Sequence, residues 1–123
     1  MEFSESRSIY LQIVDYITTG ILRKRYREGE RIPSVREMAM DIEVNPNTVT
    51  RSYAELQERN IIQNQRGIGY FVSEGVFRRI RDDRVRDLLE NEVPRLVQTL
   101  HLLNLGLDEV IEVMKTRYQE TPQ

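Results

Sequence analysis

The sequence has no cysteine, no tryptophan and a single histidine among its 123 residues. Without cysteine there is no disulfide, no thiolate nucleophile and no zinc–thiolate site, and His101 alone cannot form a site that needs two imidazoles. No run approaches the ~20 apolar residues that a membrane span requires, and residues 1–8 lack the layout of a signal peptide. We therefore expect a cytoplasmic protein with no membrane partner.

The chain also lacks an excess of either charge. It has 18 Lys and Arg against 20 Asp and Glu, for a formal net charge of −2. Residues 1–75 carry 10 basic and 11 acidic side chains, and residues 76–123 carry 8 and 9. Net charge therefore does not distinguish a nucleic-acid partner from any other. Residues 23–36 are a local exception, with 6 basic and 2 acidic side chains, a run also typical of a solvated helix end.

What the chain does have is helical periodicity in its apolar residues. After Ser8, a suitable N-cap, isoleucines recur every four residues, and this predicts a first helix that ends near Tyr26. Its apolar stripe consists of Ile9, Tyr10, Ile13, Val14, Ile17, Ile21 and Leu22. Residues 27–33 form a loop, because Gly29 favours a turn and Pro33 disfavours helix at the residue before it.

Two short helices separated by a tight turn follow this loop. Ser34 and Glu37 match a capping box at the start of a helix that runs to about Ile42. Asn45 suits the N-cap and Pro46 suits the first position of a third helix. This helix ends at Asn60. Its inward face consists of Val49, Tyr53 and Leu56. Extended runs at 61–65 and 69–73, joined by residues 66–68, then predict a β-hairpin.

From Val76 an apolar stripe continues in phase across Pro94, which favours one kinked helix over two. A turn at residues 104–106 precedes a last helix from Leu107. Two helices alone cannot cover so many apolar side chains, and a symmetric homodimer would cover them. The expected interface residues are Leu88, Leu89, Val93, Leu96, Val97, Leu100, Val110, Ile111 and Met114.

The fold class expected is therefore mainly α with a small β-hairpin: a winged helix-turn-helix domain over residues 1–75 and a two-helix dimerisation tail over 76–123. In such a domain the second helix of the pair enters the major groove, and the hairpin is a wing that approaches the DNA backbone or minor groove. The alternative is a winged-helix protein-interaction module in which the same polar residues are ordinary surface.

Three segments in this order resemble the winged-helix domain of GntR-family bacterial transcription regulators: residues 29–39 (GERIPSVREMA), 44–49 (VNPNTV) and 67–72 (GIGYFV). The short tail resembles the YtrA-type subfamily. This resemblance implies a homodimeric repressor that binds an inverted-repeat site in double-stranded DNA, often encoded beside genes for ATP-driven transporters.

The resemblance assigns a DNA contact to Arg36, and it matches Thr48 to the family threonine at the start of the recognition helix and Gly67 to the wing glycine. Pro46 and Thr50 stand where many family members carry DNA-contacting arginines, so those members' base contacts do not transfer. With the polar residues around them, the expected DNA-binding set is Ser34, Arg36, Asn45, Asn47, Thr48, Thr50, Arg51, Arg66 and Gly67.

An enzyme is not indicated. The carboxylate pairs Asp82–Asp83 and Glu90/Glu92 lie among other charged positions, as on a solvated helix face, and we predict no catalytic residue, cofactor or metal site. Two tail helices cannot enclose a pocket of ~300 Å³. Any inducer is therefore expected to act at the dimer interface or between the two parts of the chain, with Gly75 as the hinge.

Overall fold

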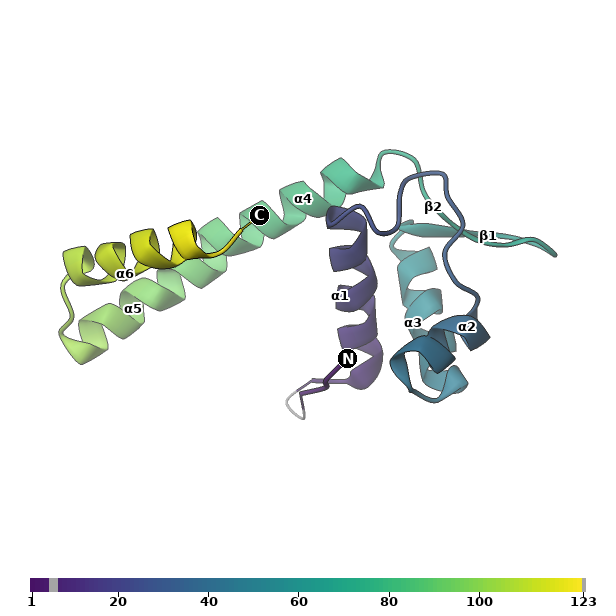
Figure 1. The fold of residues 1–123 in the computed structure, drawn as a ribbon, viewed down its shortest axis with the longest axis horizontal. Helices are drawn as coiled ribbons and strands as arrows, with labels where there is room; N and C mark the ends of the chain where they lie inside the picture. The colour runs from purple at the N-terminus through teal and green to yellow at the C-terminus, as the bar shows by residue number, and fades with distance from the viewer. Residues whose placement is uncertain (5–6, 123) are drawn as a thin grey trace. The chain divides into compact units, whose positions relative to one another are not determined.

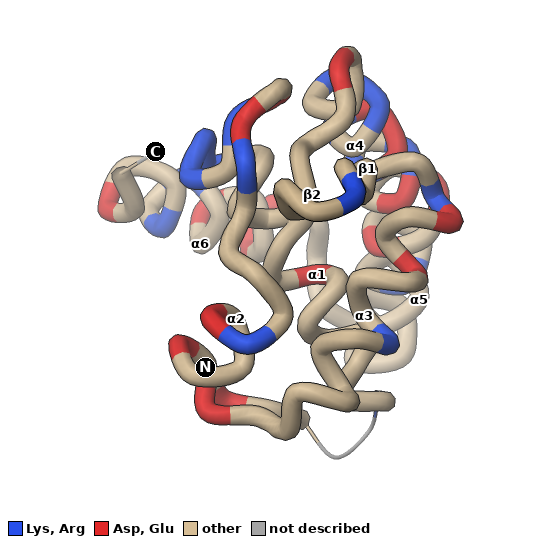
Figure 2. The backbone as a smooth tube through the Cα atoms, turned by 90° about the vertical axis from the view of Figure 1, so that its right-hand side faces the viewer, with Lys and Arg blue, Asp and Glu red and all other residues tan. Residues whose placement is uncertain are grey.

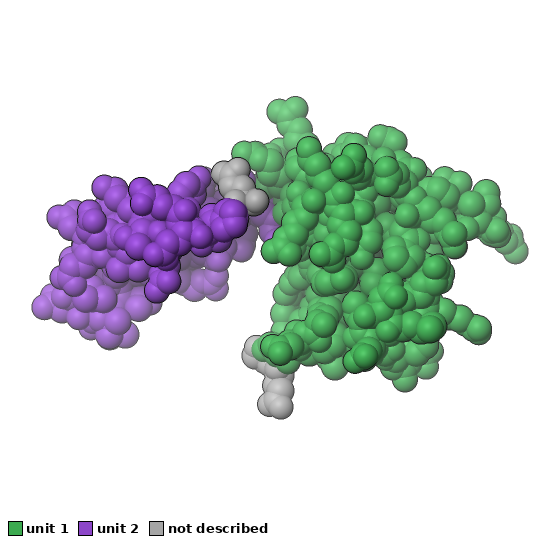
Figure 3. All heavy atoms as spheres, in the orientation of Figure 1, with its two compact units in different colours: residues 1–82 green, residues 83–123 purple. Residues whose placement is uncertain are grey.

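The computed structural model describes residues 1–4 and 7–122. The chain divides into two compact units, Met1–Asp82 and Asp83–Gln123, coloured separately in Figure 3. This division falls inside helix α4 (Val76–Asp87) and not after Gly75, where the sequence places the boundary. The first unit extends further because Val76 and Ile80 are buried in its core.

The first unit contains three helices and a hairpin in the predicted order (Figure 1). They are α1 (Ile9–Leu22), α2 (Val35–Ile42), α3 (Pro46–Glu58), β1 (Ile62–Gln65) and β2 (Gly69–Val72). Helix α3 packs against both α1 and α2, and the two strands pair antiparallel with Ile62 opposite Val72 and Gln65 opposite Gly69. The winged helix-turn-helix fold is thus confirmed.

Helix α1 ends four residues before the predicted end at Tyr26. Lys24 adopts a left-handed conformation with φ 61°, and the next two amides both bond to the carbonyl of Gly20. This reversal folds the Tyr26 ring back over Gly20, within 2.6 Å of where a Cβ would stand. The apolar periodicity could not reveal the end, because Tyr26 is half-buried through this reversed path and not through a continued helix.

The core of the first unit is aliphatic, as the composition suggests, and it has one fully buried aromatic ring. Tyr53 donates its hydroxyl to the Pro33 carbonyl at 2.6 Å, and its ring meets the Tyr70 ring edge-on with centroids 4.9 Å apart. The Ser52 hydroxyl donates to the Tyr10 carbonyl at 2.7 Å. These contacts fix α3 against α1, the loop before α2, and the hairpin.

The helical backbone continues from α4 through a π-helical turn (Leu88–Glu92) into α5 (Val93–Leu103). The residues at both junctions keep right-handed helical angles, which confirms a single distorted helix. Pro94 explains the wider turn, since it has no N–H to donate to the carbonyl of Glu90 and its ring would crowd that carbonyl. After a turn with Asn104 at φ 54°, α6 (Leu107–Glu120) follows.

Candidate nucleic-acid interface and tail

The turn between α2 and α3 is built by local hydrogen bonds that the sequence predicts. The Ser34 hydroxyl accepts from the Glu37 amide at 3.1 Å, and the Glu37 carboxylate accepts from the Ser34 amide at 3.0 Å. This second bond holds the pKa of Glu37 below its ordinary value. Asn45 Oδ1 accepts from the Asn47 amide at 2.8 Å, capping α3 as predicted.

The outward face of α3 carries the predicted polar set. Asn47, Thr50 and Arg51 are exposed and Thr48 is half-buried, whereas Val49 is fully buried. The Thr50 hydroxyl donates to the Pro46 carbonyl at 3.0 Å, so its proton is used within the helix. The exposed first turns of α3 can reach base edges or phosphates in the major groove.

Arg51 is held in place by a residue from another helix. Its guanidinium lies 3.8 Å from the centre of the Tyr10 ring, in the first turn of α1. Ser8, Asn47 and Thr48 line the same shallow depression as these two side chains. Sequence reasoning did not identify Tyr10 as part of the site, because its spacing assigns it to the apolar stripe of α1.

At the start of α2, Ser34 and Arg36 differ in what they can offer a partner. The Ser34 hydroxyl is already engaged in the capping box. Arg36 is exposed, and within residues 1–4 and 7–122 it makes no hydrogen bond or ion pair. Its neighbour Arg31 instead pairs with Glu37 at 3.8 Å.

The wing tip is open. Gly67 has φ 78°, a conformation that favours glycine, and a Cβ built on it would meet no atom within 4 Å. Arg66 beside it is exposed. Figure 2 shows basic positions in blue on α2, on α3 and at the hairpin. These elements present the side chains through which a winged helix contacts DNA.

The basic run of residues 23–36 does not form one surface. Lys24 Nζ lies 5.7 Å from the centre of the Phe77 ring, at the start of α4, while Arg36 is on α2. Arg25 lies over the Tyr16 ring of α1. Only the end of this run therefore belongs with the DNA-contact candidates.

Gly75 is less free than a hinge would be. It has φ 77°, but its amide donates to Glu28 Oε1 at 2.9 Å, and the Phe77 amide donates to Glu28 Oε2 at 2.8 Å. Because both amides stabilise the carboxylate, the pKa of Glu28 is lowered. The expected hinge is thus an anchored connection within the first unit.

The tail leaves most of its apolar stripe exposed within one chain. The exposed members of the expected interface are Leu88, Leu89, Val93, Leu96, Val97 and Met114. Leu100 differs because it is already buried in the chain, and Val110 and Ile111 are half-buried. These three residues therefore contribute first to the fold of the tail itself.

Two further observations concern the part of the chain that the structure describes. No helix there combines the length and apolarity that a membrane crossing needs. No group of three or more acidic or histidine side chains comes together there in a way that could hold a metal ion.

Residues 9–72 match the family described as "Bacterial regulatory proteins, gntR family". The chain belongs to the GntR family. It is 38% identical to the HTH-type transcriptional regulator YhcF of Bacillus subtilis, over 94% of this chain and 93% of that protein. It is 31% identical to the HTH-type transcriptional repressor YtrA of the same organism, over 89% and 84%. A solved GntR family transcriptional regulator from Listeria monocytogenes superposes with a TM-score of 0.77 at 36% identity, over 93% and 98%.

This GntR-family chain is a DNA-binding transcription regulator with a winged helix-turn-helix domain. The alternative of an interaction module without DNA binding receives no support from these relatives. They are named as transcriptional regulators and not as enzymes.

Proposed function

We propose that the protein is a homodimeric repressor that binds an inverted-repeat operator through α2, α3 and the hairpin of each copy. The observation that carries this proposal is that Arg36 on α2 is exposed and makes no hydrogen bond or ion pair with the described residues, while α3 has an exposed polar face and Arg66 is exposed at the wing tip. Phosphate contacts of this kind position a protein on DNA, and side chains of α3 read the bases.

The homodimer is supported by the uncovered apolar face of the tail. Leu96 and Val97 on α5 are each 41% exposed, and Leu89 is 61% exposed. Burying a fully exposed leucine is worth roughly 1.5–3 kcal/mol, so covering these partly exposed side chains is worth about half of that each, and a matching face on a second copy covers several of them. A two-fold dimer presents two recognition helices to half-sites ~34 Å apart, which makes an inverted repeat the matching operator.

The repressor assignment is supported by the named activity of YtrA, with which this chain shares nearly its whole length. A repressor occupies its operator in the absence of a signal. A reporter gene placed behind the selected operator should therefore be expressed at a lower level when the protein is present. Expression that rises with the protein would make it an activator.

Selection from random DNA duplexes tests the DNA-binding half of the proposal. The enriched sites should be inverted repeats, and their affinity should fall steeply with salt because phosphate contacts release counterions. Arg36→Ala should weaken binding by about 1–3 kcal/mol without loss of thermal stability, since Arg36 is exposed and makes no hydrogen bond or ion pair within the described residues. Arg23→Ala removes an exposed arginine that does not belong to the proposed DNA-binding set, and this variant should bind DNA as the wild type does. Equal losses in both variants would contradict the assignment.

Light scattering and sedimentation at micromolar concentration test the dimer. Leu96→Asp should produce monomers, because a charge would be buried in the interface. Leu102→Asp is the matched control on the same helix: its side chain is 83% exposed and lies outside the proposed interface. A wild-type monomer, or dissociation by both variants alike, would overturn this half of the proposal.

A further inference from the structure

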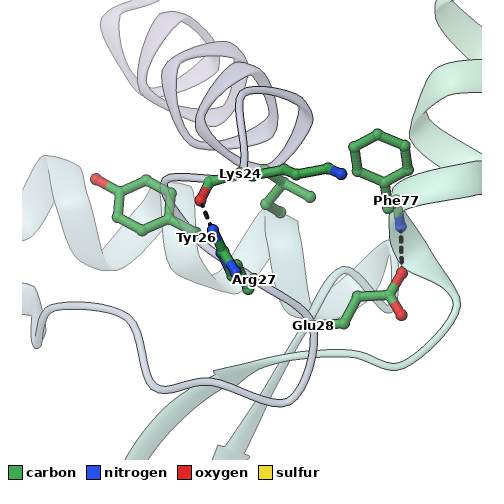
Figure 4. Close-up of a pocket in the computed structure, with 6 residues that line it drawn as sticks. Lys24, Tyr26, Arg27, Glu28 and Phe77 are labelled. Carbon is green, nitrogen blue, oxygen red and sulfur yellow. Dashed lines mark hydrogen bonds between the residues drawn. The ribbon is translucent and has the colours of Figure 1, made fainter.

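The first unit has a pocket that lies apart from the depression beside Arg51 and from the proposed DNA-binding residues. It measures about 410 Å³ and lies between the loop after α1 and the first turn of α4 (Figure 4). This volume falls within the range of small-molecule sites. Its lining residues are Ile21, Lys24, Tyr26, Arg27, Glu28 and Phe77, none of which belongs to the expected DNA-binding set.

Most of the surface that lines the pocket is apolar, although three of its six residues are charged. Ile21 is a buried member of the lining, and the half-buried rings of Tyr26 and Phe77 add aromatic surface. Apolar and aromatic walls with a few polar groups are typical of pockets that hold organic molecules. An inorganic ion would gain little from such walls.

Lys24 and Arg27 line this pocket, and neither forms an ion pair with an acidic side chain of the described residues. Figure 4 shows Lys24 extended toward Phe77, and the Arg27 side chain donates to the Lys24 carbonyl at 3.3 Å. The carboxylate of Glu28 instead accepts from the amides of Gly75 and Phe77. With two cations and one carboxylate, the lining carries a net positive charge, and the carboxylate is already held by two backbone amides.

We propose that this pocket binds a small organic anion with an aromatic or aliphatic body, such as an aromatic carboxylate or sulfonate. The anionic group would pair with Lys24 and Arg27, and the body would lie against Ile21, Tyr26 and Phe77. Such a ligand would contact the first turn of α4, which Glu28 anchors and which leads into the second unit. None of the lining residues belongs to the expected DNA-binding set or to the expected dimer interface.

Two fluorescent probes of similar shape test both the place and the charge. 8-Anilinonaphthalene-1-sulfonate is anionic, and N-phenyl-1-naphthylamine lacks the sulfonate. The full-length protein should bind the sulfonate saturably and about two- to fivefold more tightly than the neutral amine, as expected for exposed charge pairs. In two-dimensional NMR spectra, the sulfonate should shift the amide signals of Gly75 and Phe77 more than those of the tail.

Charge-matched double variants locate the cations that bind the probe. Lys24→Gln with Arg27→Gln should weaken sulfonate binding about two- to fivefold and leave the binding of the neutral amine unchanged. Arg23→Gln with Arg78→Gln removes the same charge from two exposed positions that do not line the pocket, so the affinity should be retained. Equal weakening by both pairs, equal affinity for both probes, or shifts confined to α5 and α6 would each overturn the proposal.

Discussion

The guanidinium of Arg51 lies 3.8 Å from the centre of the Tyr10 ring, so a residue of α1 positions an exposed cation of the recognition helix. The Ser52 hydroxyl, one residue further along α3, donates to the Tyr10 carbonyl at 2.7 Å. The backbone and the ring of Tyr10 are therefore both tied to α3. Stacking orders a long side chain in advance, which lowers the entropy lost when it binds a phosphate or base.

Arg51→Ala should therefore weaken operator binding by about 1–3 kcal/mol, measured by fluorescence anisotropy at fixed salt. Tyr10→Leu keeps an apolar side chain but removes the stacking ring, and it should lose a smaller part of the same affinity. Tyr10→Phe keeps the ring and should bind as the wild type does. If Tyr10→Leu binds normally while Arg51→Ala does not, the stack plays no part in recognition.

The parts of the fold that local signals encode agree with the sequence predictions. The capping box at Ser34, the Asn45–Pro46 start of α3 and the hairpin around Gly67 all appear within about one residue of their expected places. Each depends on hydrogen bonds or backbone angles among neighbours in the chain. The residue types and their spacing therefore suffice to predict them.

Features that depend on contacts between distant residues were not predictable in this way. Ser52 meets Tyr10 across 42 positions, and Glu28 meets Gly75 across 47. The basic run of residues 23–36 looks continuous in sequence, yet the reversal at Lys24 turns its first part toward α4. Only the folded chain decides which of its charges share a surface.

Tyr53→Phe should destabilise the first unit by about 1–2 kcal/mol in urea unfolding, because the Pro33 carbonyl loses the hydroxyl that it accepts from at 2.6 Å. Tyr118→Phe is a suitable control, since the Tyr118 side chain is 77% exposed. Equal stability of the two variants would mean that this hydrogen bond contributes nothing.

Stability should also fall in alkali because of the same tyrosine. Burial raises the pKa of Tyr53 above its ordinary value of 10.0, so the folded state holds the proton more tightly than the unfolded state does. This difference in pKa contributes fully to the free energy of unfolding below about pH 10, and the contribution is lost as the pH rises further. The free energy of unfolding should decline less steeply above pH 10 in Tyr53→Phe than in the wild type. Parallel declines would contradict this account.

Glu43→Gly should stabilise the protein. Glu43 ends α2 with φ 57°, a left-handed angle that costs a residue with a side chain about 1–2 kcal/mol. Glycine removes this cost, but its greater conformational entropy in the unfolded chain destabilises the fold by about 0.5–1 kcal/mol. The expected net gain is about 0.5–1 kcal/mol in chemical denaturation. Asp41→Gly, within the same helix and also exposed, should instead destabilise by a similar amount. Losses in both variants would show that Glu43 has a contact worth more than its strain.

Glu28→Gln should loosen the start of α4. The variant keeps one acceptor oxygen, but its amide group cannot accept from the second backbone N–H, so the Gly75 and Phe77 amides should exchange hydrogen faster. The hydrogen bonds from the Gly75 and Phe77 amides lower the pKa of Glu28. The ionised Glu28 side chain therefore stabilises the folded state fully above about pH 4.5, and this contribution is lost as the pH falls further. The difference in thermal stability between wild type and Glu28→Gln should therefore be present at pH 7 and shrink in acid.

Glu30→Gln changes a neighbouring exposed carboxylate that makes no side-chain bond to the described residues, and it should behave as the wild type at both pH values. A difference that persists unchanged in acid would show that the charge of Glu28 does not anchor α4.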